Sequence, residues 1–196
     1  MFIVIDGIDG SGKGEMINRL HNYLFSRNKK NRILTTREPT YGRYGRQIRE
    51  ILKKEKDPMK NAELLLDLYV KDRKKHVENV IKPFLKGENS IVLCDRYYYS
   101  TIAFQHTQGI DLRLILERNR EFPKPDFCFI LDLDPKIALE RISKTRQKEK
   151  FEDLKFMEKL RKNFLELKNI LDDNIIVIDA SKSKEEVSEE IKALLE

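Results

Sequence analysis

The sequence predicts an α/β protein in which a five-stranded parallel sheet is covered by helices on both faces. Five short runs rich in Ile, Val, Leu and Phe are apolar without alternation, a pattern typical of strands buried on both sides. These runs are residues 2–6, 32–36, 90–94, 126–132 and 174–179. Longer charged segments separate them, with apolar stripes at helical spacing in 16–24, 64–68 and 156–171. This alternation indicates a doubly wound sheet, and the length of 196 residues without repeats or linkers indicates one domain, 1–196.

Basic residues outnumber acidic ones, 39 to 33, which gives a net charge of +6. A basic balance suits an anionic ligand such as the phosphates of a nucleotide. Most of these residues lie beside acidic ones at helical spacing, as in 53–57, and we interpret them as a solvated surface. We therefore expect small anionic ligands and no nucleic-acid or membrane partner.

The two cysteines, Cys94 and Cys128, lie inside or at the end of apolar runs, so we expect buried thiols and no disulfide. No apolar run approaches the roughly 18 residues that a membrane span needs. The chain starts with a strand-like run instead of a basic leader. These features predict a cytoplasmic protein.

A glycine-rich loop follows the first strand and precedes the first helix, with the spacing Gly-x-x-x-x-Gly-Lys. Glycines let backbone N–H groups approach phosphates, and the start of the helix adds unpaired donors and a positive dipole. Lys13 adds a charge for the outer phosphates. We therefore predict a phosphate-binding loop (P-loop) for ATP. Its residues are Gly7, Ile8, Asp9, Gly10, Ser11, Gly12, Lys13 and Gly14.

The loop departs from the usual pattern at its last position. P-loops place Ser or Thr after the lysine, and its hydroxyl helps to bind Mg²⁺. Here the residue is Gly14, followed by Glu15. A water could replace the hydroxyl, Glu15 could reach the metal, or the metal site could be weakened. Asp95 ends the third strand, where a carboxylate organises Mg²⁺ in P-loop proteins, and we expect it to act through water.

Further polar residues follow the second strand and line the third long helix. Arg37 follows the second strand, where it could bind a phosphate or pair with Glu38 at the surface. Tyr69 and Arg73 share a helix face and could stack on a base and bind its edge, or form a surface pair. His76 continues this face and is interpreted as structural.

The third strand leads into Asp95, Arg96 and three consecutive tyrosines at 97–99, with Phe104 and Gln105 a helical turn later. Some of the tyrosines should be core, and at least one should line a ligand pocket. No Ser-His-Asp or Cys-His arrangement indicates nucleophilic catalysis.

Taken together, these motifs resemble the thymidylate kinase family of P-loop nucleoside monophosphate kinases. The resemblance runs in order through IDGIDGSGKG, TREP, LLDLYVKDRKKHVENVIKP, LCDRYYYSTIAFQ, PKPDFCFILDLDPKIALERI and KEKFED, over nearly the whole chain. It implies the fold of that family and phosphoryl transfer from ATP to dTMP, giving dTDP and ADP for dTTP synthesis. It also implies Mg²⁺ with ATP and a homodimer.

The resemblance assigns an acceptor site. Asp9 would contact the deoxyribose 3′-hydroxyl, and Arg37 and Arg96 would hold the phosphate of dTMP. Tyr69 stands where the family usually has phenylalanine and would stack on thymine. Arg73 would hydrogen-bond a thymine carbonyl.

The start of the helix after the three tyrosines completes this site. Thr101 and Gln105 would meet the edge of the base, with Ser100 beside them. Phe104 would crowd the 2′ position and favour deoxyribose.

The basic segment at about 143–152 resembles the lid that closes over ATP in this family, with Arg141 and Lys144 at its start. The P-loop lacks an arginine, so the resemblance implies that the lid supplies the catalytic one, with Arg146 as first candidate. The predicted catalytic residues are Lys13, Asp95, Arg96 and Arg146, and Arg141 is predicted to bind ATP.

Two alternatives to an active dTMP kinase stay open. One is a kinase of the same fold for another nucleoside monophosphate or a deoxynucleoside, although two arginines for the acceptor favour a phosphorylated one. The other is a nucleotide-binding protein with weak or no catalysis, because Gly14 replaces the Ser or Thr of the loop.

Overall fold

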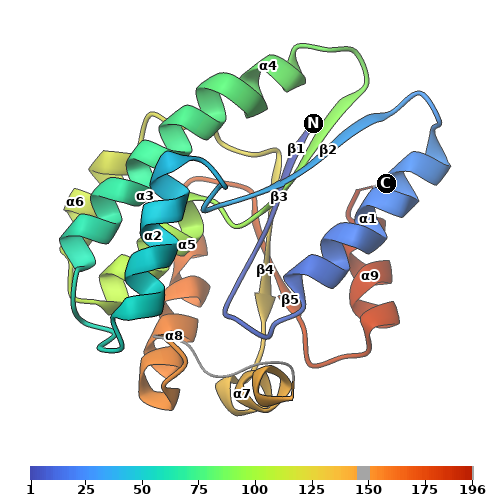
Figure 1. Ribbon diagram of the computed structural model, residues 1–196. Coiled ribbons are helices and arrows are strands. Elements are labelled where there is room, and N and C mark those ends of the chain that lie inside the picture. Colours follow the sequence, from blue (N-terminus) through green and yellow to red (C-terminus); the bar gives the residue numbers. More distant parts are fainter. Residues whose placement is uncertain (145–150, 196) are drawn as a thin grey trace.

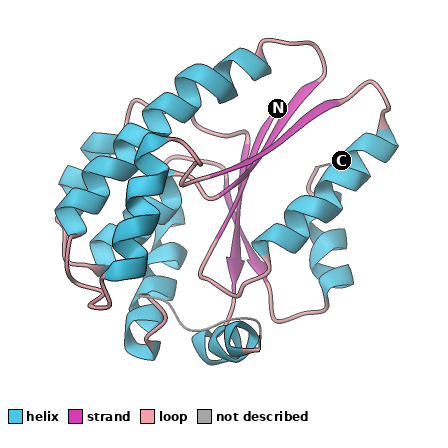
Figure 2. Ribbon diagram, in the orientation of Figure 1, coloured by secondary structure: helices cyan, strands magenta, loops and turns pink. Residues whose placement is uncertain are grey.

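A computed structural model describes residues 1–144 and 151–195. Its centre is a sheet of five parallel strands in the order β2-β3-β1-β4-β5 (Figures 1 and 2). The strands are β1 (Phe2–Asp6), β2 (Arg32–Arg37), β3 (Ser90–Asp95), β4 (Phe127–Asp132) and β5 (Ile175–Asp179). The predicted fold class is confirmed, and every predicted strand agrees with the structure within one residue at each end.

Helices cover both faces of the sheet. Figure 1 shows α1 and α9 on one face and α2 to α6 with α8 on the other, while α7 lies near the carboxyl ends of the strands. The helices are α1 (Lys13–Arg27), α2 (Arg43–Lys54), α3 (Ala62–His76), α4 (Lys82–Leu85), α5 (Tyr98–Thr107), α6 (Leu112–Asn119), α7 (Pro135–Ser143), α8 (Leu154–Ile170) and α9 (Lys184–Ala193). A π-helical turn, Val77–Ile81, joins α3 to α4.

The core follows from the apolarity of the central strands. All five residues of β1 are buried, and β3 and β4 are buried over most of their length, whereas the edge strand β2 is partly exposed. Cys94 and Cys128 lie in this core as free thiols, as predicted, and burial raises the pKa of both. Within the described residues, no helix combines the length and the apolarity that crossing a bilayer requires.

The strand order places the loops of the site side by side. The chain leaves β1 toward α1 on one face, while β3 and β4 pair with β1 on either side. Ligands of such sheets bind outside the carboxyl ends of the strands, where the order reverses. Arg37 at the end of β2 is in register with Asp95 at the end of β3, so both predicted site residues lie at this edge.

Candidate functional site

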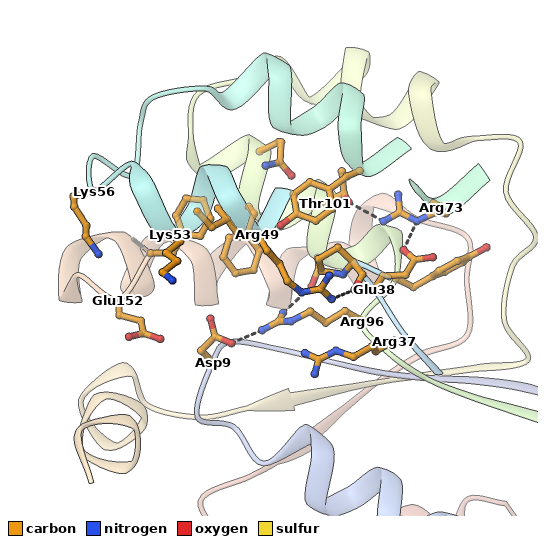
Figure 3. Close-up of a pocket in the computed structure, with 18 residues that line it drawn as sticks. Asp9, Arg37, Glu38, Arg49, Lys53, Lys56, Arg73, Arg96, Thr101 and Glu152 are labelled. Carbon is orange, nitrogen blue, oxygen red and sulfur yellow. Dashed lines mark hydrogen bonds and ion pairs between the residues drawn. The ribbon is translucent and has the colours of Figure 1, made fainter. Parts of the chain in front are cut away.

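The largest group of predicted residues lines one cavity of about 580 Å³ at the carboxyl edge of the sheet (Figure 3). The P-loop and the ends of β2 and β3 contribute to it, together with α2, α3 and α5. Nine predicted acceptor residues line it: Asp9, Arg37, Tyr69, Arg73, Arg96, Ser100, Thr101, Phe104 and Gln105. They come from four distant stretches of sequence, and the fold brings them together.

Arg96 is held tightly at the centre of the cavity. Its guanidinium donates to Asp9 at 2.6 Å, to the Gly7 carbonyl at 3.0 Å and to Ser100 Oγ at 2.8 Å. Its backbone φ of 68° is left-handed, which is strained for a residue with a side chain and is typical of functional positions. Asp9 and Arg96 therefore form a pair before any ligand enters.

The buried carboxylate of Asp6 stabilises this strained turn. It accepts hydrogen bonds from the backbone N–H groups of Gly7, Tyr97 and Ser100 and from the Ser100 hydroxyl. Burial raises the pKa of Asp6, although Arg96 and these donors oppose the change. Asp6 thus ties the end of β1 to the start of α5. The sequence does not predict this role, because its only signal is a carboxylate at the end of an apolar strand.

Arg73 lies at the inner end of the cavity and is 1% exposed. It donates from Nε to Glu38 at 2.8 Å, from Nη1 to Asn119 Oδ1, and from Nη2 to Thr101 Oγ1 at 2.8 Å. The second oxygen of Glu38 lies 3.0 Å from His76 Nδ1. Because Arg73 is buried and donates to three protein groups, the alternative that Tyr69 and Arg73 form a surface pair is wrong.

His76 has the structural role that the sequence predicted, because it is buried between Glu38 and Thr36, whose Oγ1 lies 2.7 Å from Nε2. Glu38 is itself 3% exposed and faces inward. The alternative in which Arg37 pairs with Glu38 at the surface is therefore wrong. Arg37 is exposed at the end of β2, and its side chain forms no hydrogen bond or ion pair within the described residues.

Aromatic rings form the walls of the cavity. The half-buried Tyr69 lines it, and burial raises the pKa of its hydroxyl to about 12, which keeps the ring neutral. The ring centres of Phe104 and Phe151 lie 5.1 Å apart. The guanidinium carbon of Arg96 lies 5.5 Å from the ring centre of Phe104. Of the three tyrosines, Tyr97 lines the cavity, while Tyr98 and Tyr99 are buried and bind Asp173.

Several lining residues of this cavity are not among those predicted from the sequence. Arg49, Lys53 and Lys56 project from one side of α2 and the turn after it, and Figure 3 shows the two lysines near Glu152, at the opposite end from Arg73. Their spacing was a usable signal, but the charge-rich surroundings made a solvated surface the simpler interpretation. Phe151 and Glu152 also line the cavity, at the end of the predicted lid.

A second cavity, of about 630 Å³, lies on the other side of the P-loop. The predicted residues Asp9, Gly10, Ser11, Gly12 and Arg141 line it, together with Lys144 and with Lys182 and Lys184 from the segment after β5. Arg141 at the end of α7 donates to the carbonyls of Gly10 and Ala180. The arrangement suits a nucleotide. The loop after β5 could have been suspected, since it follows a strand at the ligand edge.

The P-loop needs its first two glycines for steric reasons. A Cβ on Gly7, with φ 136°, would lie 2.6 Å from the Leu131 carbonyl oxygen, and one on Gly10, with φ 80°, would lie 2.7 Å from that of Ala138. Lys13 donates to the carbonyls of Gly7 and Ile8, at 3.2 and 2.9 Å. Burial, with a smaller effect of Arg96, lowers the pKa of Lys13 to about 8.

Gly14, Asp95 and Arg37 line a third cleft, of about 670 Å³, next to the P-loop. Asp95 Oδ1 is buried and lacks a hydrogen-bond partner among the described residues, so it has capacity for a water or an ion. No cluster of three His, Cys, Asp or Glu that could hold a metal occurs in the described part. A single carboxylate is compatible with a Mg²⁺ ion whose other ligands are phosphate oxygens and waters.

Glu15 is drawn away from this cleft. Its carboxylate accepts from Arg19 at 2.7 Å and lies 3.8 Å from Lys184, and the hydrogen bond from Arg19 lowers its pKa. Glu15 lines the second cavity, whereas Asp95 lines the third. We therefore do not retain Glu15 as a metal ligand. The predicted Arg146, and most of the predicted lid, lie outside the described residues.

Comparisons with known proteins agree with this geometry. The family model for thymidylate kinase matches residues 5–191. A probable thymidylate kinase of Archaeoglobus fulgidus is 39% identical over 100% of this chain and 95% of its own length. A thymidylate kinase of Sulfurihydrogenibium is 39% identical over 92% of this chain and 89% of its own.

Solved structures give the same result. The crystal structure of thymidylate kinase from Ehrlichia chaffeensis superposes with a TM-score of 0.79 and 30% identity, covering 100% of this chain and 98% of that one. The chain therefore belongs to the thymidylate kinase family.

Proposed function

We propose that this chain transfers the terminal phosphoryl group of ATP to dTMP, giving dTDP and ADP for dTTP synthesis. The observation that carries the proposal is the cavity that holds buried base-reading groups at one end and Arg37 and Arg96 nearer the P-loop. The Arg37 side chain forms no ion pair within the described residues, so a nucleoside without phosphate would leave its charge unpaired, whereas Arg96 already pairs with Asp9. The names of the relatives supply thymidylate as the acceptor.

Transfer in this site is direct and in line. Arg37 and Arg96 hold the acceptor phosphate, and Lys13 with the P-loop amides holds the donor phosphates. Asp9, already paired with Arg96, orients the sugar through its 3′-hydroxyl. The role of these groups is to position the substrates and neutralise charge on the transferring oxygens, so no covalent intermediate is needed.

Mg²⁺ bound with ATP would neutralise charge on the phosphates, and Asp95 would hold it through water. Arg141 would contact ATP, and Arg146 from the lid would add positive charge at the transferring group. Lid closure would keep water from the phosphoryl group. A homodimer, expected from the resemblance, and a cytoplasmic location, expected from the sequence features above, complete the proposal.

A steady-state assay of dTMP phosphorylation against Mg²⁺ concentration tests this function. We expect turnover that saturates with Mg²⁺. Absence of turnover at saturating Mg²⁺, with ATP and dTMP binding intact in calorimetry, would instead establish the nucleotide-binding protein that Gly14 suggests. A panel of dTMP, dUMP, dCMP and thymidine tests the acceptor, and faster turnover of any other member would displace dTMP.

A further inference from the structure

Gln105 carries a buried oxygen that accepts no hydrogen bond from the part of the chain that the structure describes. Its side chain is 0% exposed and lines the acceptor cavity, and Oε1 has no hydrogen-bond partner within the described residues. Buried carbonyl oxygens are nearly always paired in folded proteins. The oxygen is therefore suited to accept a hydrogen bond from a ligand.

Two consecutive hydrogen bonds, through Gln108 to Pro58, fix the orientation of the Gln105 amide. Gln105 Nε2 donates to Gln108 Oε1 at 2.9 Å, and Gln108 Nε2 donates to the backbone carbonyl of Pro58. A carbonyl only accepts, so Gln108 must turn its NH₂ toward Pro58 and its oxygen toward Gln105. Gln105 must then turn its own NH₂ toward Gln108. Exchanging the oxygen and nitrogen of either amide, or of both, would set two oxygens against each other.

The hydrogen bond from Arg73 fixes the Thr101 hydroxyl as an acceptor toward the guanidinium. A guanidinium has no acceptor, so in the hydrogen bond from Arg73 Nη2 the Thr101 oxygen accepts, and its own hydrogen is left to donate elsewhere. Among residues 1–144 and 151–195, Arg73 makes three of its five possible donations, which leaves two N–H groups for a ligand. The inner end of the cavity thus offers one acceptor, on Gln105, and donors on Arg73 and Thr101.

This pattern matches one class of pyrimidine. Thymine and uracil present an N–H at position 3 beside a carbonyl at position 4, whereas cytosine presents a bare nitrogen beside an amino group. Thymine or uracil can donate from N3 to Gln105 and accept at O4 from Arg73 or Thr101. In cytosine, N3 would set an acceptor against the Gln105 oxygen, and the amino group would set a donor against Arg73. A site built to pair a donor rejects a ligand that lacks it far more strongly than an apolar pocket does.

We propose that Gln108, anchored on the Pro58 carbonyl, is a positioning residue that turns the oxygen of Gln105 toward the base and so sets the preference for dTMP over dCMP. This inference rests on the proposed function. Pro58 lies between α2 and α3, so the connection between these helices is tied to base selection through two amides.

The test compares Gln108→Leu, Gln105→Leu and the double variant in binding and turnover of dTMP and dCMP. Without Gln108 the amide of Gln105 can rotate, so we expect the dTMP-to-dCMP preference to fall at least tenfold. The change should appear in Kd and KM, with kcat nearly constant. Because Gln108 acts through Gln105, adding Gln108→Leu to Gln105→Leu should change nothing further.

Two further variants separate positioning from stability. Asn163→Leu removes hydrogen bonds to Thr107 and Ala103 on the same helix, so it should lower the melting temperature without changing the preference. Gln108→Glu can donate to Pro58 and accept from Gln105 while protonated. Ionisation removes only the donation to Pro58, because a carboxylate still accepts from Gln105, so this variant should keep the wild-type preference at every pH while its melting temperature falls as the carboxyl ionises. A folded Gln108→Glu variant without the preference would contradict the inference, which keeps the test available if the leucine variant fails to fold.

Two outcomes are distinguishable. A wild-type chain that does not prefer dTMP overturns both the proposed function and the inference. A wild-type preference that survives in Gln108→Leu, or effects that add in the double variant, overturn the inference alone.

Discussion

Glu38 is the counter-charge of the buried part of the acceptor site, and replacing it with glutamine tests how that part is held together. Its carboxylate and the guanidinium of Arg73 are 3% and 1% exposed and lie 2.8 Å apart. Its other oxygen faces His76. Glu38→Gln keeps the shape but removes the charge, and it sets an NH₂ group against neighbours that donate.

The expected loss follows from burial. Removing one partner of a buried ion pair leaves the other charge uncompensated, which costs about 3–5 kcal/mol. That is a large part of a typical unfolding free energy of about 5–15 kcal/mol. At about 2–4 °C per kcal/mol for a chain of this size, the melting temperature should fall by about 6–20 °C. Arg73 should also leave its position, so the KM for dTMP should rise.

Thermal unfolding followed by circular dichroism measures the first effect, and dTMP titration measures the second. Asp67→Asn is the matched control, because Asp67 pairs with Lys71 and Arg118 at the surface. Exposed pairs contribute about 0–1 kcal/mol, so this control should shift the melting temperature by less than about 4 °C. A Glu38→Gln shift no larger than that of the control would refute the view that Glu38 compensates a buried charge.

The remaining predictions concern the phosphate-binding groups. Arg37→Ala should leave the melting temperature nearly unchanged, since Arg37 is exposed. It should raise the KM for dTMP about ten- to a hundredfold, because a charge-assisted hydrogen bond to the phosphate is lost. An unchanged KM would show that Arg37 does not bind dTMP. Lys13, whose pKa is about 8, should lose its charge as pH rises through 8, so ATP affinity measured by calorimetry should weaken there, and a constant affinity up to pH 9.5 would contradict this. Because this folded-state pKa lies below the usual 10.5, the same group should make the fold more stable as pH rises from about 8 to 10.5. Gly14→Thr should lower the Mg²⁺ concentration for half-maximal rate, and an identical Mg²⁺ profile would exclude position 14 from the metal site.

The fold was predictable because its signals are local. Each strand was predicted from an apolar run. The central strands β1, β3 and β4 are buried as these runs predict, whereas the edge strands β2 and β5 are partly exposed because only one side of each pairs with a neighbour. The nine predicted acceptor residues that line the first cavity were selected in the same way, since they follow strand ends or share a helix face, but the roles proposed for them came from the family resemblance. A local sequence pattern does not identify hydrogen-bond and ion-pair partners that are distant in the sequence.

Glu38 shows this limit most clearly. In the sequence its nearest basic neighbour is Arg37, and a surface pair was a reasonable alternative. In the structure its partner is Arg73, 35 residues away, because β2 and α3 bring them together. Gln108 is similar, since its link to Pro58 spans 50 residues and leaves no periodic signal. Buried polar networks depend on tertiary contacts, so they stay hidden until the fold is known.

Gly14 requires a different kind of explanation from the other glycines of the loop. Gly7 and Gly10 are needed because a Cβ would strike the backbone, whereas a Cβ on Gly14 would meet no described atom within 4 Å. Gly14 also lies in α1 without a left-handed φ, where glycine is a poor helix former. Steric demand therefore does not explain it, and its consequence is chemical: one oxygen ligand fewer. Mg²⁺ normally keeps several waters, and one more can take the vacant position at the expense of affinity. The substitution should thus weaken metal binding and leave the route of phosphoryl transfer intact.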